Sequence, residues 1–217
     1  MDKNLNEIYI KQIERTKKAL EKNRFEVFTA DNSSEACKIA QSLLTDGAVV
    51  ASGGSMTLEE CGMTNILRSG KYNYLDRTKT NDKTALFRQS FSADFYFCSS
   101  NAVTENGELY NVDGNGNRVA CICYGPSKVI MIVGRNKIVK NLEDAVKRVK
   151  IYAAPSNTLR LSCKTYCHES GKCMGLNGAM TEGCLSDDRI CSSYVVSAFQ
   201  RVPKRIAVIL VNEELGY

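Results

Sequence analysis

A glycine-rich loop, Ser52-Gly53-Gly54-Ser55-Met56-Thr57, has residue types that suit ligand binding. It follows a short apolar run at residues 47–51, which is typical of a buried strand, and it precedes a segment expected to be helical. Glycines let backbone N–H groups approach an anion, and hydroxyl groups add further donors. We therefore expect ligand contacts from Gly53, Gly54, Ser55 and Thr57.

A purely structural role for the end of this loop stays open. Thr57 and Glu60 have the spacing of a capping box, in which Thr57 would be the N-cap and Glu60 would reach back to it. Glu60 is therefore both a candidate ligand contact and a candidate cap.

A second polar loop, residues 99–107, follows an apolar run at 94–98. If the strands before the two loops are parallel neighbours, both loops lie at the same sheet edge. Glu105 is the candidate catalytic residue, because a loop carboxylate can attack an activated acyl group; the alternative is an exposed turn residue. The hydrogen-bonding candidates are Ser100, Asn101 and Thr104.

Three more polar residues are candidate ligand contacts. Residues 113–117 (Asp-Gly-Asn-Gly-Asn) predict a hairpin tip between strands at 108–112 and 118–124, so turn geometry alone explains Asn117. Arg118 could pair bidentately with a carboxylate or phosphate. Lys137 follows the apolar run 128–133 and would either meet an anion there or be solvated.

Cysteines are concentrated near the end of the chain, with His168 beside the second of them. Thiolates gathered in this way suit tetrahedral zinc or an iron–sulfur cluster, whereas free thiols or a disulfide are the alternatives. His168 is the one histidine, which argues against a catalytic triad in the sheet core. The candidate metal ligands are Cys163, Cys167, Cys173, Cys184 and Cys191.

Apolar periodicity predicts strands that alternate with helices. This order favours an α/β fold with a mainly parallel sheet and helices on both faces. Between residues 160 and 203 the period is lost, which predicts a cysteine-rich excursion before the last strand of a single domain, residues 1–217. Helices are expected at 3–22, 32–44, 58–67, 82–91 and 142–153, with the last ending before Pro155, and strands at 24–29, 47–51, 72–75, 94–98, 128–133 and 205–211.

Charge and hydropathy exclude several classes of protein. The net charge of +5 comes from scattered basic residues without interleaved aromatics, so nucleic acid is not an expected partner. No segment approaches the roughly 20 apolar residues that span a bilayer. The charged N-terminal segment lacks the apolar core of a signal peptide, so we expect a cytoplasmic protein.

Four segments resemble the LUD (lactate-utilisation) domain family: residues 52–62, 99–120, 125–145 and the cysteine stretch with 189–191. The resemblance covers nearly the whole chain. It implies a fold similar to that of glucosamine-6-phosphate isomerase, ribose-5-phosphate isomerase and CoA transferase. Relatives with this tail tend to close the third and fourth cysteines into C-x2-C, whereas residues 174–183 stretch that gap here.

The resemblance also implies a function in lactate or related organic-acid metabolism, with a small anionic or acyl ligand at loops 52–57 and 99–107. An alternative is a non-catalytic accessory or assembly subunit whose cysteine tail binds metal or a redox or lactate-oxidation partner protein. A phosphosugar isomerase is a further alternative, which rests on fold analogy alone. A homo-oligomer also stays open.

Overall fold

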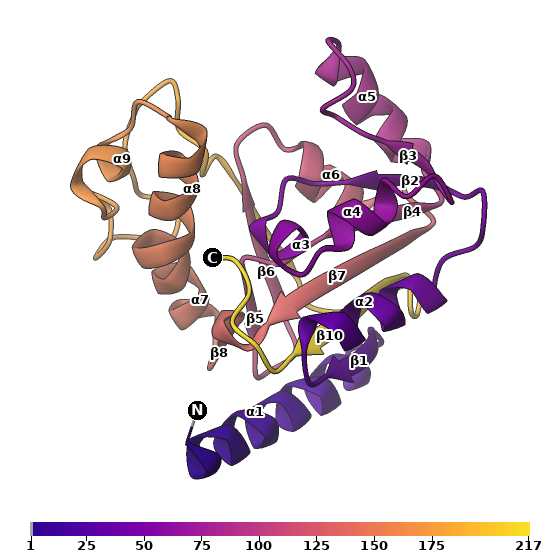
Figure 1. Ribbon diagram of the computed structural model, residues 1–217. Coiled ribbons are helices and arrows are strands. Elements are labelled where there is room, and N and C mark those ends of the chain that lie inside the picture. The colour runs from indigo at the N-terminus through magenta and orange to yellow at the C-terminus, as the bar shows by residue number, and fades with distance from the viewer. Residues whose placement is uncertain (1) are drawn as a thin grey trace.

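The computed structural model describes residues 2–217, and strands and helices alternate along much of the chain (Figure 1). The larger sheet has six strands within these residues, in the order β1-β10-β7-β4-β2-β3, and every neighbouring pair is parallel. The α/β class with a mainly parallel sheet is thus confirmed. The strands are β1 (Glu26–Ala30), β2 (Val49–Ser52), β3 (Asn73–Leu75), β4 (Phe95–Cys98), β7 (Lys128–Gly134) and β10 (Ile206–Val211).

Both faces of this sheet are covered, which explains why β10 is apolar throughout and β7 is apolar after Lys128. Along β7, Met131 packs into the core on one face and Ile130 into the core on the other. Side chains of α1 (Lys3–Lys22) and α6 (Asn117–Cys123) join the first core, and those of α2 (Ser33–Ser42), α3 (Met56–Glu60) and α4 (Met63–Leu67) join the second.

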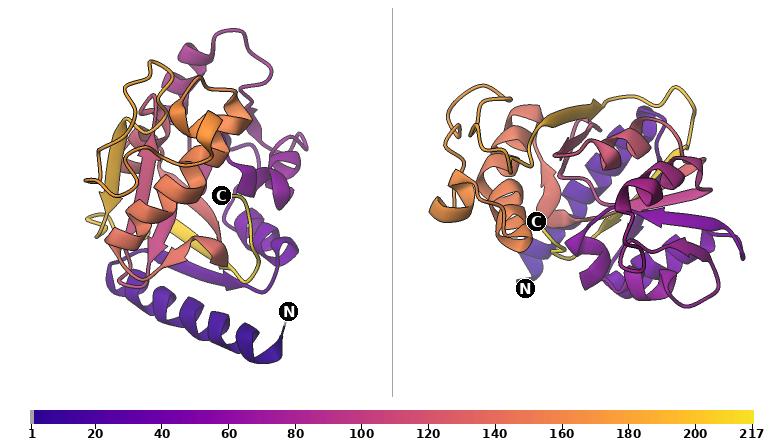
Figure 2. Two further views of the ribbon diagram at one scale, coloured as in Figure 1. Left: turned by 90° about the vertical axis from the view of Figure 1, so that its left-hand side faces the viewer. Right: turned by 90° about the horizontal axis from the view of Figure 1, so that it is seen from above.

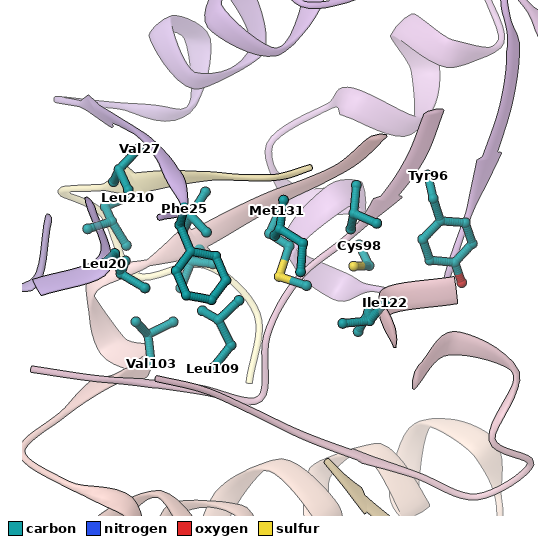
Figure 3. Close-up of a cluster of buried hydrophobic side chains, with 14 of the residues drawn as sticks. Leu20, Phe25, Val27, Tyr96, Cys98, Val103, Leu109, Ile122, Met131 and Leu210 are labelled. Carbon is teal, nitrogen blue, oxygen red and sulfur yellow. The ribbon is translucent and has the colours of Figure 1, made fainter. Parts of the chain in front are cut away.

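A second, smaller sheet packs against the first core. Its order is β8-β5-β6-β9, and β6 is antiparallel to both of its neighbours. Figure 3 shows Val103 and Leu109 of this sheet close to Leu20, Phe25 and Met131. The strands are β5 (Ala102–Thr104), β6 (Leu109–Asp113), β8 (Ile138–Val139) and β9 (Ser193–Ser197).

The other side of the smaller sheet is covered by a continuous helical segment. It consists of α7 (Leu142–Arg148), a π-helical turn (Val149–Ala153) and α8 (Ala154–Leu161). The prediction that the helix ends before Pro155 is wrong. Pro155 lies in the first turn of α8, directly after the π-turn, and the change from π-helical to α-helical bonding accommodates a residue without an N–H.

The predicted hairpin around residues 113–117 is also wrong. β6 is paired with β5 and β9, and residues 117–123 form α6 instead of a strand. The Asp113 carboxylate accepts hydrogen bonds from the backbone N–H groups of Arg118 (2.9 Å) and Val119 (3.1 Å), which initiates the helix. Gly116, with φ of 77°, provides the turn before it.

Two further predicted elements differ in detail. The helix expected at 58–67 is divided into α3 and α4 by Gly62, which has φ of 81°. The excursion at 160–203 contains α9 (Tyr166–Ser170) and β9, which joins the smaller sheet. Among residues 2–217, no helix combines the length and apolar composition that crossing a bilayer requires.

Candidate functional site

The carboxyl ends of three neighbouring strands bring a buried lysine against two hydroxyl groups. Lys137 Nζ donates hydrogen bonds to Thr57 Oγ1 at 2.8 Å and to Ser99 Oγ at 3.2 Å. These residues follow β7, β2 and β4 respectively, and parallel strands end at a common edge. The Lys137 side chain is enclosed, because the residue is only 3% exposed.

Two arginines lie beside this lysine and bind neutral acceptors. Arg118 Nη1 donates to Asn111 Oδ1 at 2.6 Å, and its Nη2 donates to Asn101 Oδ1 at 2.8 Å. Arg148 Nη1 donates to the Asn101 carbonyl at 2.6 Å. Within residues 2–217, no carboxylate forms an ion pair with these arginines or with Lys137.

Burial, together with the neighbouring positive charges, changes the protonation of the lysine. Burial lowers the pKa of Lys137 to about 7, and the nearby charges of Arg148 and Arg118 act in the same direction. Burial also lowers the pKa of Arg148, to about 10. Near neutral pH, Lys137 therefore exists both as an ammonium, which can pair with an anion, and as a free amine, which can accept a proton.

The glycine-rich loop lies against the side chains of Arg118 and Arg77. A Cβ atom at Gly53 would lie 3.1 Å from both Arg118 Cδ and Tyr96 Oη. A Cβ atom at Gly54 would overlap the guanidinium group of Arg77. Arg77 forms no ion pair in the described part of the chain, so its charge is also available to an anion near the loop.

The predicted capping box is not formed. Ser55 is the N-cap of α3, and its hydroxyl accepts a hydrogen bond from the Leu58 N–H at 3.4 Å. Thr57 is inside the helix, where its hydroxyl donates to the Leu215 carbonyl at 3.1 Å. The Glu60 carboxylate accepts from the Gly216 N–H at 2.6 Å. Ser55, Thr57 and Glu60 thus all have structural partners.

The C-terminal strap, residues 212–217, closes the site. The side chain of Asn136 donates to the Gly216 carbonyl at 2.8 Å and accepts from the Leu215 N–H at 3.1 Å. A Cβ atom at Gly216 would lie 2.7 Å from Thr57 Oγ1 and 3.4 Å from Lys137 Nζ. In Figures 1 and 2 the strap ends between α3 and α8, which places it over the carboxyl edge of the sheet.

The second predicted loop is only partly at this edge. Ser99 and Asn101 lie at the carboxyl edge of the larger sheet, but from Ala102 the chain continues into β5 of the smaller sheet. Ser100 donates to the Ala102 carbonyl at 2.8 Å, and Thr104 donates to the Glu108 carboxylate at 2.8 Å, so both hydroxyls serve the smaller sheet.

Glu105 is held against α1 rather than beside Lys137. Its carboxylate forms an ion pair with Arg15 at 3.0 Å and accepts a hydrogen bond from Gln12 at 2.9 Å. These contacts give the Glu105 carboxylate a structural role, and they do not favour the hypothesis that Glu105 is a nucleophile.

The cysteines of the excursion are free thiols. Among residues 2–217, no three His, Cys, Asp or Glu side chains are arranged to hold a metal ion. Cys167 is buried, with its sulfur near the hydroxyls of Thr158 and Thr165, and Lys150 donates to the Gly175 and Ala179 carbonyls in the stretched gap. The described geometry does not fit zinc or an iron–sulfur cluster, and metal binding by this segment stays a prediction.

Several site residues were not predicted from the sequence. Ser99 directly follows the strand predicted at 94–98, and Arg77 closely follows the strand predicted at 72–75. A systematic search of strand ends would therefore have found both residues. Asn111 is inside a strand and Arg148 is inside a helical segment, and no local pattern distinguishes either of them.

Comparisons with known proteins agree with this architecture. A family model for the LUD domain matches residues 13–211. A crystal structure of a DUF162 family protein from Deinococcus radiodurans is similar, with 12% sequence identity and a TM-score of 0.52 over 94% of this chain and 97% of that chain. At this identity the likeness concerns the fold alone. No curated protein matches the chain.

Proposed function

Because the chain belongs to the LUD domain family, we propose that it binds a small anionic or acyl ligand of lactate or related organic-acid metabolism. The ligand would bind at the carboxyl edge of the larger sheet. The observation that carries this proposal is a group of three cations, the buried Lys137 and Arg148 and the half-buried Arg118, which no carboxylate in the described residues neutralises. Buried charge is costly without a partner, so an anion would stabilise the group.

The donors for such a ligand are present in this group. The Lys137 ammonium has three N–H bonds, of which two are directed to Thr57 and Ser99. Arg148 uses Nε and Nη1 for carbonyl oxygens, which leaves Nη2 for a further acceptor. An ammonium next to a planar guanidinium is suited to a carboxylate, an acyl oxygen or a phosphate.

The C-terminal strap controls access in this proposal. Gly216 lies where a ligand would contact Thr57 and Lys137 from the solvent side. Binding would therefore require the end of the strap, residues 215–217, to move, and this end would then shield the bound ligand from water. Hydrogen bonds with Thr57, Glu60 and Asn136 hold this end, whereas Asn212 and Glu213 are also bonded to Ala30, Ser33 and Arg135 and should stay in place. Opening the end alone costs less than unfolding the protein.

Direct binding measurements test the proposal. Calorimetric titration with lactate, pyruvate, an acyl-CoA and a sugar phosphate should identify a ligand for the native protein. Lys137→Met should weaken binding of that ligand at least about tenfold, equivalent to about 1.4 kcal/mol. Lys140→Met is the matched control, because Lys140 is exposed and forms no ion pair among residues 2–217.

Two results would contradict the proposal: no member of the panel binds, or Lys137→Met binds as tightly as the native protein. A ligand should also raise the free energy of unfolding, by about 2.7 kcal/mol at a concentration 100 times Kd. Preferential binding of the sugar phosphate would favour the isomerase alternative.

The accessory-subunit alternative has one observation in its favour. Apolar side chains of the excursion are exposed, namely Tyr166 at 43%, Met174 at 58% and Leu185 at 96%. Exposed apolar surface of this kind suits contact with another protein. Metal analysis of protein purified without oxygen, together with titration of its thiols, separates a metal-holding tail from a tail of free cysteines.

A further inference from the structure

A groove of about 670 Å³ lies between α5 (Lys83–Gln89) and α6, apart from the sheet-edge site. Its volume is within the roughly 300–1,000 Å³ that is usual for small-molecule sites. We propose that this groove binds a second small ligand, which carries a planar aromatic ring and an anionic group and has about the size of a nucleoside monophosphate. The lining residues on which the proposal depends are Phe87, Arg88, Phe91, Asn115 and Asn117.

The walls of the groove are fixed before any ligand arrives. On the α6 side, the Asp113 carboxylate accepts from the N–H groups of Gly114, Arg118 and Val119 and thereby holds the turn with Asn115 and the start of α6 with Asn117. On the α5 side, the ring of Phe91 packs closely on Gly125, whose φ of 100° is available to glycine at little cost. A preformed site avoids the entropy cost of ordering loops on binding.

The floor of the groove suits an aromatic ring. Phe87 and Phe91 both line it, and Phe91 is 38% exposed although it is a large apolar residue. Tyr124 extends the aromatic surface, with its ring centroid 6.4 Å from that of Phe91. A base or a similar planar ring stacks on such side chains with about 1–3 kcal/mol per stacked ring.

The rim supplies polar groups that the protein does not use itself. Arg88 is exposed and forms no ion pair within residues 2–217. The side-chain amides of Asn115 and Asn117 also have no hydrogen-bond partner in that part of the chain, whereas the adjacent Arg118 is fully engaged at the sheet edge. A guanidinium next to two amides recognises an anionic group and its neighbouring hydroxyl or ring nitrogen atoms.

This assignment changes the interpretation of Asn117. Although its neighbour Arg118 contacts the sheet-edge cluster, Asn117 lines the groove. The two sites share no lining residue, so their ligands should bind independently of each other.

Adenosine 5′-monophosphate is the probe for this groove, used with the full chain in calorimetric titration and ligand-observed NMR. Phe87→Ala should weaken its binding about tenfold through lost stacking. Arg88→Ala should weaken it about threefold through the lost charge pair. Adenosine and ribose 5-phosphate, which each lack one of the two recognised groups, should both bind more weakly than the nucleotide.

Two controls locate the binding. Arg201→Ala removes another exposed arginine outside the groove and should leave nucleotide affinity unchanged. Lys137→Met alters the sheet-edge site and should also leave it unchanged, which separates this proposal from the function proposed above. Phe87 is only half-buried and Arg88 is exposed, so circular dichroism should show folded variants.

The proposal is overturned if the nucleotide does not bind at millimolar concentration or binds equally well to Phe87→Ala and Arg88→Ala. Loss of binding in Lys137→Met with normal binding in Phe87→Ala would place the nucleotide at the sheet edge and would also overturn it.

Discussion

The Lys137 ammonium lies 2.8 Å from the Thr57 hydroxyl, although 80 residues separate the two in the chain. The same hydroxyl donates to the Leu215 carbonyl, so one threonine links the lysine to the C-terminal strap. The arrangement encloses an amine among other cations. Its consequences for stability, for ligand affinity and for the strap can each be measured.

The stability of the protein should rise with pH above about 7. The pKa of Lys137 is near 7 when folded and near its ordinary value of 10.5 when unfolded, so the unfolded chain binds more protons between these values. The free energy of unfolding should therefore increase by up to about 1.4 kcal/mol per pH unit in this range. Urea unfolding at pH 7, 8 and 9 measures the rise, and Lys137→Met should remove it.

The affinity for an anionic ligand should have the opposite pH dependence. The ammonium form of Lys137 attracts an anion, and this form is lost as the pH rises through its pKa of about 7. Dissociation constants measured at pH 6 and pH 8.5 should differ several-fold in the native protein and be equal in Lys137→Met. An affinity that rises with pH would indicate that the neutral amine binds the ligand.

Gly216→Ala should loosen the C-terminal strap. Its φ of 57° disfavours alanine by about 1–2 kcal/mol. The new Cβ atom would also meet the Thr57 hydroxyl at 2.7 Å. Lys137 should then be acetylated faster by acetic anhydride, as followed by mass spectrometry. Gly171→Ala is the control, because Gly171 has φ of 71° with no atom near its Cβ position, and it should leave Lys137 protected.

Arg118→Lys should destabilise the protein, although it preserves the charge. Arg118 donates to the side chains of Asn101 and Asn111 and to the Ser99 and Val112 carbonyls, and a lysine cannot satisfy all four acceptors. Leaving one or two buried acceptors unpaired should cost about 2–4 kcal/mol in urea unfolding. Arg88→Lys, on the exposed side of α5, should change stability by less than about 0.5 kcal/mol.

Glu105→Gln distinguishes a structural carboxylate from a catalytic one. It weakens the ion pair with Arg15, which is largely exposed, and should therefore cost no more than about 1 kcal/mol. Ligand affinity at the sheet edge should be unchanged. Loss of binding or turnover in a folded Glu105→Gln protein would restore the hypothesis of a nucleophile.

The sequence alone determined the α/β class, the family and most of the larger sheet. The apolar runs at 128–133 and 205–211 predict buried parallel strands, because strands covered on both faces need no polar alternation. The position of the glycine-rich loop after β2 follows from the same local signal. The isomerase and CoA-transferase likeness, in contrast, stays a prediction.

Only the tertiary structure decided the roles of individual side chains, because those roles depend on contacts between distant residues. The turn residues at 113–117 predict a strand at 118–124, but the Asp113 carboxylate and the core select a helix. Thr57 and Glu60 have the local spacing of a cap, but the C-terminal strap binds both. The sequence leaves Lys137 open between an anion contact and a solvated residue, and its burial arises from three strand ends and the strap that meet around it.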